Sequence, residues 1–187
     1  MRKLIVTEFL SLDGVMEAPG PSDDFKLAGW TVPFRNEKTG IFKRDELYAG
    51  GALLLGRKTY EVFAQAWPKM KDPQGFADRM NGLPKHVVSS KLQDLAWNNS
   101  HILSGDLADG VRALKTQPGG DILVYGSGKL AGALLHHGLV DELRFLVFPV
   151  VLGSGQRFFE QPPYGTVQTI ETRDMDSGVT LLRYAVQ

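Results

Sequence analysis

Residues 121–135 read DILVYGSGKLAGALL, a strand signal that passes through glycines into a helix signal. The short apolar run over 122–126 predicts a buried strand. The Leu- and Ala-rich run over 130–135 favours a helix. Between them, the GSGK turn at 126–129 leaves the first backbone N–H groups of the helix unpaired at the positive end of its dipole. Phosphate is the ligand that such a turn suits.

The match of this turn to known phosphate motifs is incomplete. It is not a Walker A loop, because Leu123 stands where the first glycine is required and Leu130 stands where Ser or Thr follows the lysine. The spacing of Gly126, Gly128 and Ala131 approaches the dinucleotide-binding fingerprint, but no acidic residue ends the next expected strand. The turn alone leaves two alternatives open, phosphate binding and a tight strand-to-helix connection without a ligand.

Length and composition predict one globular domain over 1–187, with 43% hydrophobic and 22% charged residues. Lys plus Arg equals Asp plus Glu, 21 each, so charge gives no case for nucleic acid or membrane binding. The absence of cysteine excludes disulfides, thiolate metal sites and thiol catalysis, and we expect no metal. No apolar run suits a signal peptide or a bilayer span, so we expect a cytoplasmic protein.

The chain alternates strand and helix signals over its first three quarters. Strands are expected over 3–10, 52–55, 85–89, 101–104, 122–126 and 142–151, and helices over 37–48, 57–67, 106–116 and 130–135. The loop over 11–33 is either a lid or a disordered insert. Two β-rich runs, 166–173 and 179–186, predict a closing hairpin. We therefore predict an α/β fold with a mixed, mainly parallel sheet of about eight strands and flanking helices.

Three turns of similar chemistry each follow a short apolar strand, at 56–59, 89–91 and 126–129. Ligands of an open parallel sheet bind outside the carboxyl ends of its strands. If these strands are parallel neighbours, their turns converge on one ligand with several anionic groups. The three cations at 57, 58 and 91 exceed what a bare pyrophosphate needs, which favours a nicotinamide dinucleotide carrying a 2′-phosphate.

The segment LLGRKTYE at 54–61 resembles the strand-and-turn signature of the dihydrofolate reductase fold, as do VSSK at 88–91 and YGSG at 125–128. The remaining segments are similar to the reductase domain of riboflavin biosynthesis, the bifunctional deaminase-reductase C-terminal family; they are SLDG at 11–14, VDEL at 140–143 and PVVLGSG at 149–155. The resemblance covers nearly the whole chain. It implies a dihydrofolate-reductase-like fold and NADPH-dependent reduction of a pyrimidine- or pterin-like substrate. The zinc deaminase half of the bifunctional enzymes is absent, since the chain has no cysteine.

The resemblance also implies roles for individual residues. The first turn would hold the 2′-phosphate and pyrophosphate, the second the adenosine end, and the glycine turn the pyrophosphate, while residues 13–16 would cover the nicotinamide. The implied cofactor-binding residues are Gly14, Val15, Gly56, Arg57, Lys58, Thr59, Ser89, Ser90, Lys91, Gly126, Ser127, Gly128, Lys129 and Leu130.

The substrate side is less determined, because the first-helix carboxylate that anchors the pteridine in dihydrofolate reductases has only Glu37 as its nearest counterpart. Asp13 and Glu37 are the candidate catalytic acids, although Asp13 in its Leu-Asp-Gly context also fits a plain turn. Glu8, Trp30 and Glu46 are the candidate substrate-binding residues, and Trp30 also fits a packing role.

We therefore expect direct hydride transfer from NADPH to a C=N or C=O carbon of a small molecule, as in 5-amino-6-(5-phosphoribosylamino)uracil reductase. A dihydrofolate reductase proper, a non-catalytic nucleotide-binding protein and a plain structural module are the alternatives. A homodimer is expected because dimers are the commonest oligomers.

Overall fold

The computed structural model describes residues 1–21, 24–160 and 165–187. Its strands are β1 (Leu4–Ser11), β2 (Gly50–Gly56), β3 (Lys85–Val88), β4 (Ser100–Ile102), β5 (Asp121–Tyr125), β6 (Glu142–Phe148), β7 (Val167–Asp174) and β8 (Thr180–Val186). Its helices are α1 (Glu37–Ala49), α2 (Arg57–Ala66), α3 (Phe76–Gly82), α4 (Leu107–Thr116) and α5 (Gly128–His136), with short 3-10 turns η1 (Val32–Phe34) and η2 (Trp67–Lys69).

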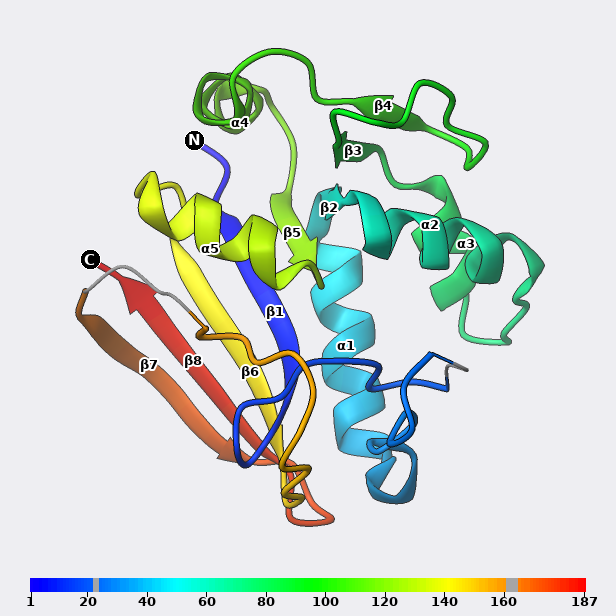
Figure 1. The fold of residues 1–187 in the computed structure, drawn as a ribbon, viewed down its shortest axis with the longest axis vertical. Helices are drawn as coiled ribbons and strands as arrows, with labels where there is room; N and C mark the ends of the chain where they lie inside the picture. The colour runs from blue at the N-terminus through cyan, green and yellow to red at the C-terminus, as the bar shows by residue number, and fades with distance from the viewer. Residues whose placement is uncertain (22–23, 161–164) are drawn as a thin grey trace.

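Within the described residues, one eight-stranded sheet runs in the order β4-β3-β2-β5-β1-β6-β8-β7 (Figure 1). Neighbours from β4 to β6 are parallel. β8 pairs antiparallel with β6 and forms the closing hairpin with β7. The predicted α/β fold with a mainly parallel sheet and a C-terminal hairpin is confirmed. The strand expected over 142–151, with an interruption at Pro149, ends at Phe148, because Pro149 has no N–H to donate to a sheet ladder.

Helices cover both faces of the central strands. Leu53 and Leu55 of β2 pack in one buried cluster with residues of α1, α2 and α3, whereas Leu54 packs in another with residues of α4 and α5. Successive side chains of a strand point to opposite faces, so a strand covered on both sides is apolar throughout. This is why 52–55 contains no polar residue. No helix of the described segments has the length and apolarity needed to cross a membrane.

The chain changes direction between β1 and β5. From β1 it continues through α1 to β2, whereas from β5 it crosses through α5 to β6 on the opposite side of β1 (Figure 1). Pairing of β1 with β5 stops at Thr7 and Tyr125, while its pairing with β6 continues to Ser11 and Phe148. The last residues of β1 therefore have a free edge on the β5 side. Such a switch point is where open α/β sheets bind their ligands.

The loop between β1 and α1 is anchored to the protein at several points. Val15 and Met16 are buried, and Val15 forms an isolated bridge with Arg157. Trp30 is 6% exposed and its indole N–H donates to the Glu17 carbonyl over 2.8 Å. The described part of the loop thus fits a folded cover better than a disordered insert; positions 22 and 23 lie outside the described residues.

Candidate functional site

The three turns meet at one edge of the sheet. β3, β2 and β5 are adjacent and parallel, so the turns that follow them lie side by side, as the sequence predicts. Ser127 joins two of the turns directly: its Oγ accepts the Gly56 N–H over 3.0 Å and lies 2.8 Å from the Thr59 hydroxyl. The segments at 56–59 and 126–129 are therefore one structural unit.

Two helices begin at this edge without a side-chain cap. The N-cap residues of α2 and α5 are Gly56 and Ser127, and neither caps its helix by a side-chain hydrogen bond. Gly126 and Ser127 both have φ near +65°, at 67° and 65°. A Cβ on Gly126 would lie 2.8 Å from the Thr59 hydroxyl oxygen, and one on Gly56 would lie 2.3 Å from the Ser127 oxygen. Glycine is required at both positions, and the uncapped N–H groups suit a pyrophosphate.

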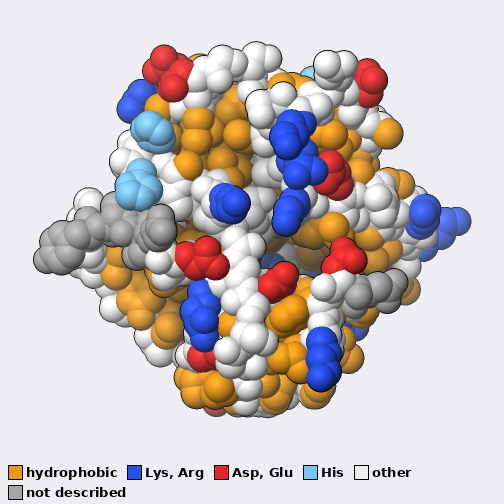
Figure 2. All heavy atoms as spheres, in the orientation of Figure 1, with side chains coloured by type: hydrophobic (Ala, Val, Ile, Leu, Met, Phe, Trp, Pro, Cys, Tyr) orange, Lys and Arg blue, Asp and Glu red, His pale blue; other side chains and the backbone are white. Residues whose placement is uncertain are grey.

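An open groove of about 710 Å³ lies at this edge, beyond the carboxyl ends of β3 and β4. Arg57, Ser89, Ser90 and Lys91 line it together with residues between Ile102 and Leu107. Arg57 binds both oxygens of Glu61, at 3.0 and 2.9 Å, and its side chain is 37% exposed. Figure 2 shows Lys, Arg, Asp and Glu side chains together on the face of the molecule viewed in Figure 1. The groove has the cations and hydroxyls that a 2′-phosphate would need.

The other predicted cofactor residues have different surroundings. Lys58 and Lys129 are exposed, and neither lines this groove or the pocket at the start of α1. Leu130 is buried in the core, so only its backbone faces the turn. The backbone N–H groups of Gly14 and Val15 are bonded to Ser11.

The loop that carries Gly14 and Val15 still reaches the glycine turn. A Cβ on Gly128 would lie 2.9 Å from the sulfur of Met16. Met16, at the end of the segment over 13–16, therefore lies against the start of α5, where it can cover a ligand bound at the turn.

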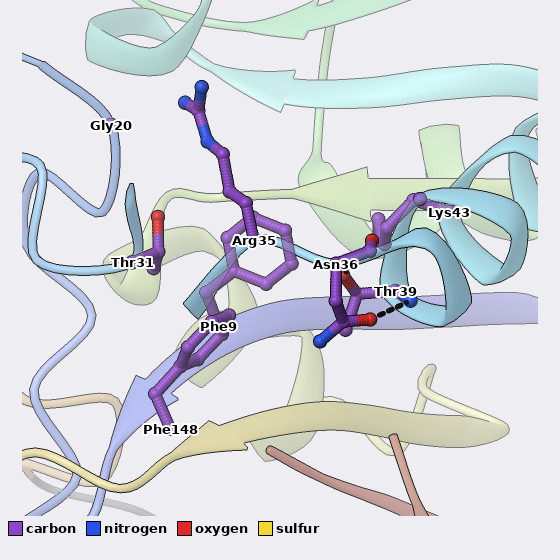
Figure 3. Close-up of a pocket in the computed structure, with 9 residues that line it drawn as sticks. Phe9, Gly20, Thr31, Arg35, Asn36, Thr39, Lys43 and Phe148 are labelled. Atoms are coloured by element: carbon purple, nitrogen blue, oxygen red, sulfur yellow. Dashed lines mark hydrogen bonds between the residues drawn. The ribbon is translucent and has the colours of Figure 1, made fainter. Parts of the chain in front are cut away.

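A second pocket, of about 320 Å³, lies between the end of β1, the end of β6 and the start of α1 (Figure 3). The Phe9 and Phe148 rings meet edge to face, with centroids 5.5 Å apart. Trp30, a predicted substrate-binding residue, is not a lining residue of this pocket; it packs edge-on against Phe148 and supports it. The lining residues are Phe9, Gly20, Thr31, Arg35, Asn36, Thr39, Gly40, Lys43 and Phe148. The pocket is apolar on the strand side and polar on the helix side, which suits a flat heterocycle.

Lys43 is fixed at the inner end of this pocket by Glu46, which is 4% exposed. The Lys43 ammonium binds the Glu46 carboxylate, donates to the Thr7 hydroxyl over 2.9 Å and lies 4.4 Å from the Tyr125 ring centroid. The other Glu46 oxygen accepts from Arg144 over 3.3 Å. Glu46 therefore neutralises and positions cations and is itself outside the pocket lining.

Glu8 differs from every other acid near the site. It is 7% exposed, and its Oε1 has no hydrogen-bond partner, one of three such buried side-chain atoms in the described residues. The pKa of Glu8 is raised to about 8, chiefly by burial; Lys43 and the backbone N–H of Gly126 act against this rise, and the neighbouring Glu46 adds to it. The Glu8 carboxyl is therefore neutral at pH 7.

The two predicted catalytic acids are poorly placed for proton transfer. The Asp13 carboxylate accepts from Ser11 over 2.7 Å and from the Leu152 and Gly153 N–H groups over 3.1 and 2.9 Å. These bonds lower the pKa of Asp13 to about 2, so the turn interpretation fits it. Glu37 is exposed on the first turn of α1 and, in the described part of the chain, lines neither pocket.

Sequence reasoning missed Phe9, Arg35, Lys43 and Phe148 as pocket residues. Both phenylalanines lie in apolar strands, where a core role is the ordinary interpretation. A weak signal existed for Lys43, because it precedes Glu46 by one helical turn and so shares its face.

Comparison with known proteins agrees with this geometry. The model of the RibD C-terminal domain family matches residues 2–181. The Bacillus subtilis (strain 168) protein named "Uncharacterized protein YyaP" is 28% identical over 186 residues, covering 98% of this chain and 94% of that protein. A putative riboflavin biosynthesis protein from Shewanella sp. PV-4 superposes with a TM-score of 0.77 at 21% identity, covering 99% of both chains.

A diaminohydroxyphosphoribosylaminopyrimidine deaminase/5-amino-6-(5-phosphoribosylamino)uracil reductase from Thermotoga maritima superposes with a TM-score of 0.67 at 15% identity. It covers 100% of this chain, which spans 57% of that structure's chain. At sequence identities of 15–21%, the similarity to these solved structures shows the fold alone. The family model, in contrast, matches nearly the whole sequence. The chain belongs to the RibD C-terminal domain family.

Proposed function

We propose that this protein is an NADPH-dependent reductase of a pyrimidine- or pterin-like ring, with an activity like that of 5-amino-6-(5-phosphoribosylamino)uracil reductase. One observation carries the proposal: three adjacent parallel strands end in turns whose N–H groups, hydroxyls and cations meet beside the switch point of the sheet. The name of the Thermotoga maritima relative includes reduction of a uracil derivative, which supports the same substrate class.

The two sites would bind different ligands, the cofactor at the turns and the substrate in the second pocket. The uncapped starts of α2 and α5 would hold the pyrophosphate, and Arg57 and Lys91 would hold the 2′-phosphate. When bound, the dinucleotide supplies a hydride to a C=N or C=O carbon of the substrate. The Phe9 and Phe148 rings would pack against the substrate ring, while Lys43 would donate to one of its oxygen or nitrogen atoms.

The carboxylates of α1 argue against folate as the substrate. In dihydrofolate reductases the pteridine of folate is anchored by a first-helix carboxylate, which needs a free oxygen that faces the pocket. Glu37 is exposed outside the pocket, and Glu46 is bonded to Lys43 and Arg144. A dihydrofolate reductase proper would bind methotrexate tightly, whereas we expect no tight binding.

The proposal is tested by titrating the protein with NADPH and, separately, NADH, followed by calorimetry. Charged hydrogen bonds contribute about 1.5–3 kcal/mol each. Arg57→Ala and Lys91→Ala should therefore each weaken NADPH binding by roughly tenfold or more and leave NADH nearly unchanged. Arg112→Ala is the matched control, because Arg112 is an exposed helical arginine paired with Asp109. It should alter neither affinity.

The catalytic part of the proposal is tested by NADPH oxidation with a panel of pyrimidine, pterin and quinone acceptors. Turnover of a pyrimidine or pterin with an NADPH preference supports the reductase. Tight NADPH binding without turnover of any acceptor would indicate a non-catalytic nucleotide-binding protein. If the protein binds neither NADPH nor NADH, the proposal is wrong and a structural module is the remaining alternative.

A further inference from the structure

We propose that Glu8 is the acid that gives a proton to the substrate during the reduction. The inference rests on the proposed function and adds to it the proton donor, for which sequence reasoning names only Asp13 and Glu37. It follows from where β1 places this side chain and from the partners that surround it.

Glu8 occupies the switch point of the sheet. It is the first residue of β1 beyond the last pair with β5, Thr7 with Tyr125, so its backbone lies where the β5 side opens. The backbone N–H of Gly126, in the glycine turn, faces its carboxyl. Phe9 points to the opposite face of the strand, and Glu8 itself lines neither the groove nor the substrate pocket. Lys43, which does line the substrate pocket, acts on the Glu8 carboxyl electrostatically. The carboxyl is therefore placed between the turn assigned to the dinucleotide and the Lys43 end of the pocket assigned to the substrate.

The Glu8 carboxyl has the protonation state that a donor needs. Its Oε1 is buried without a partner, and a buried carboxyl without a paired cation favours the neutral form. From α1, Lys43 and Glu46 act on it with opposite signs. From β6 it faces Phe145 in the register, while Arg144 is bonded to Glu46 and Glu142.

The remaining neighbours of Glu8 add no cation to it. On the turn side Lys129 is exposed, and in the loop over 12–16 Asp13 is held by its own turn. No cation within the described segments is bonded to Glu8. Because its pKa is about 8, the Glu8 carboxyl keeps its proton at neutral pH.

The other acids near the site do not qualify. Asp13 is ionised above about pH 2. Both oxygens of Glu46 are already engaged, one by Lys43 and the other by Arg144. The Tyr125 hydroxyl lies 3.4 Å from Glu46, and burial followed by that carboxylate raises its pKa well above the usual value. Glu8 alone combines burial, an unpartnered oxygen and a neutral carboxyl at pH 7.

The step balances in electrons and protons. The unsaturated carbon of the substrate accepts the hydride and its electron pair, and the π bond to nitrogen or oxygen breaks. The heteroatom then takes the proton from the Glu8 carboxyl, so one O–H bond breaks and one N–H or O–H bond forms. The substrate is reduced by two electrons at the expense of the reduced nicotinamide. Water returns a proton to the Glu8 carboxylate before the next turnover.

The first test needs no substrate. Glutamate side-chain carbonyl carbons are labelled with ¹³C and titrated by NMR in the wild type and in Glu8→Gln, whose missing signal assigns Glu8. The expected midpoint is near pH 8, far above that of an ordinary glutamate at 4.5. A midpoint below about pH 6 would mean an ionised carboxylate at neutral pH and would overturn the proposal.

The second test measures single-turnover reduction of the acceptor that the panel identifies, between pH 5 and 10. In the wild type the rate should fall above about pH 8, as the donor loses its proton. Glu8→Gln should lower the rate about a hundredfold or more and remove this dependence, with NADPH affinity within a few-fold of the wild type. Glu8→Asp, which keeps an acid on a shorter stem, should fall between them.

Glu171→Gln is the matched control, since Glu171 is a strand carboxylate at the far edge of the sheet, bonded to Arg173 and Arg183. It should leave rate and pH profile unchanged. If Glu8→Gln retains the turnover of the wild type, Glu8 is not the proton donor, and the proposed reductase function is unaffected. Wild-type protein that reduces no acceptor overturns both.

Discussion

Replacing Glu8 by glutamine should remove a pH-dependent loss of stability. In the unfolded chain this carboxyl ionises near its ordinary pKa of 4.5, whereas burial raises the folded value to about 8. Between these values the folded protein holds one more proton than the unfolded chain. Stability follows the proton difference between the two states, so the free energy of unfolding should fall as pH rises from about 4.5 to 8.

The magnitude follows from the two pKa values. At about 1.4 kcal/mol per pH unit, ionising Glu8 in its buried site costs on the order of 5 kcal/mol above pH 8. This is large against the roughly 5–15 kcal/mol that stabilises a typical domain. Glutamine is neutral at every pH, has the same length and can still accept from the Gly126 N–H. The stability of Glu8→Gln should therefore exceed that of the wild type by several kcal/mol at pH 8.5 and differ little from it at pH 5.

The assay is urea unfolding of both proteins at half-unit steps from pH 5 to 8.5, with the difference in unfolding free energy plotted against pH. Glu171→Gln serves again as the control. Arg173 and Arg183 lower the pKa of Glu171, so its contribution to stability is complete above about pH 4.5 and the control difference should be constant across this range. Parallel curves for Glu8→Gln and the wild type would refute the reasoning, because they would mean that Glu8 is ionised at neutral pH.

Three other substitutions test the framework around the site. Ser127→Ala removes the bonds to Gly56 and Thr59, and urea unfolding should show a loss of about 1–3 kcal/mol, with weaker NADPH binding by calorimetry. Lys85→Met removes the hydrogen bonds that the buried Lys85 ammonium donates to three backbone carbonyls. The free energy of unfolding should fall by about 3 kcal/mol or more in the same assay. Asp13→Asn should lower the melting temperature at pH 7 but much less near pH 2. The Asp13 carboxylate contributes fully to stability above its unfolded pKa of 3.8, and this contribution disappears as the pH falls through its folded pKa of about 2.

The predictable part of the site is the part encoded in short segments. Strand, glycine turn and helix follow one another within a few residues at 54–61 and 121–135, so local pattern is enough to place cations and N–H groups at strand ends. Their convergence then follows from parallel pairing. The bonds of Ser127 to Gly56 and Thr59 confirm that these distant segments meet. The cofactor role of these residues stays a prediction.

The substrate side could not be predicted because it depends on contacts between distant elements. Phe9 and Phe148 lie on different strands and come together through the register of β1 with β6. Glu37 was the acid nearest to the expected anchor position, yet α1 places the buried carboxylate more than two turns later, at Glu46. Helix periodicity alone does not reveal which turn faces the sheet.

Glu8 shows most clearly what the sequence leaves open. Val6 and Leu10 flank it on the same face of β1, and both are buried in the core, so packing alone would place an apolar residue between them. A carboxyl there gains no salt bridge in the described structure, and it reduces the stability of the fold at neutral and higher pH. Local propensity and core packing do not account for it. What distinguishes its position is that β5 ends beside it, and that the glycine turn and Lys43 of the substrate pocket both act on its carboxyl. A residue that weakens the fold at the one point where the two proposed ligands meet is best explained by chemistry done there.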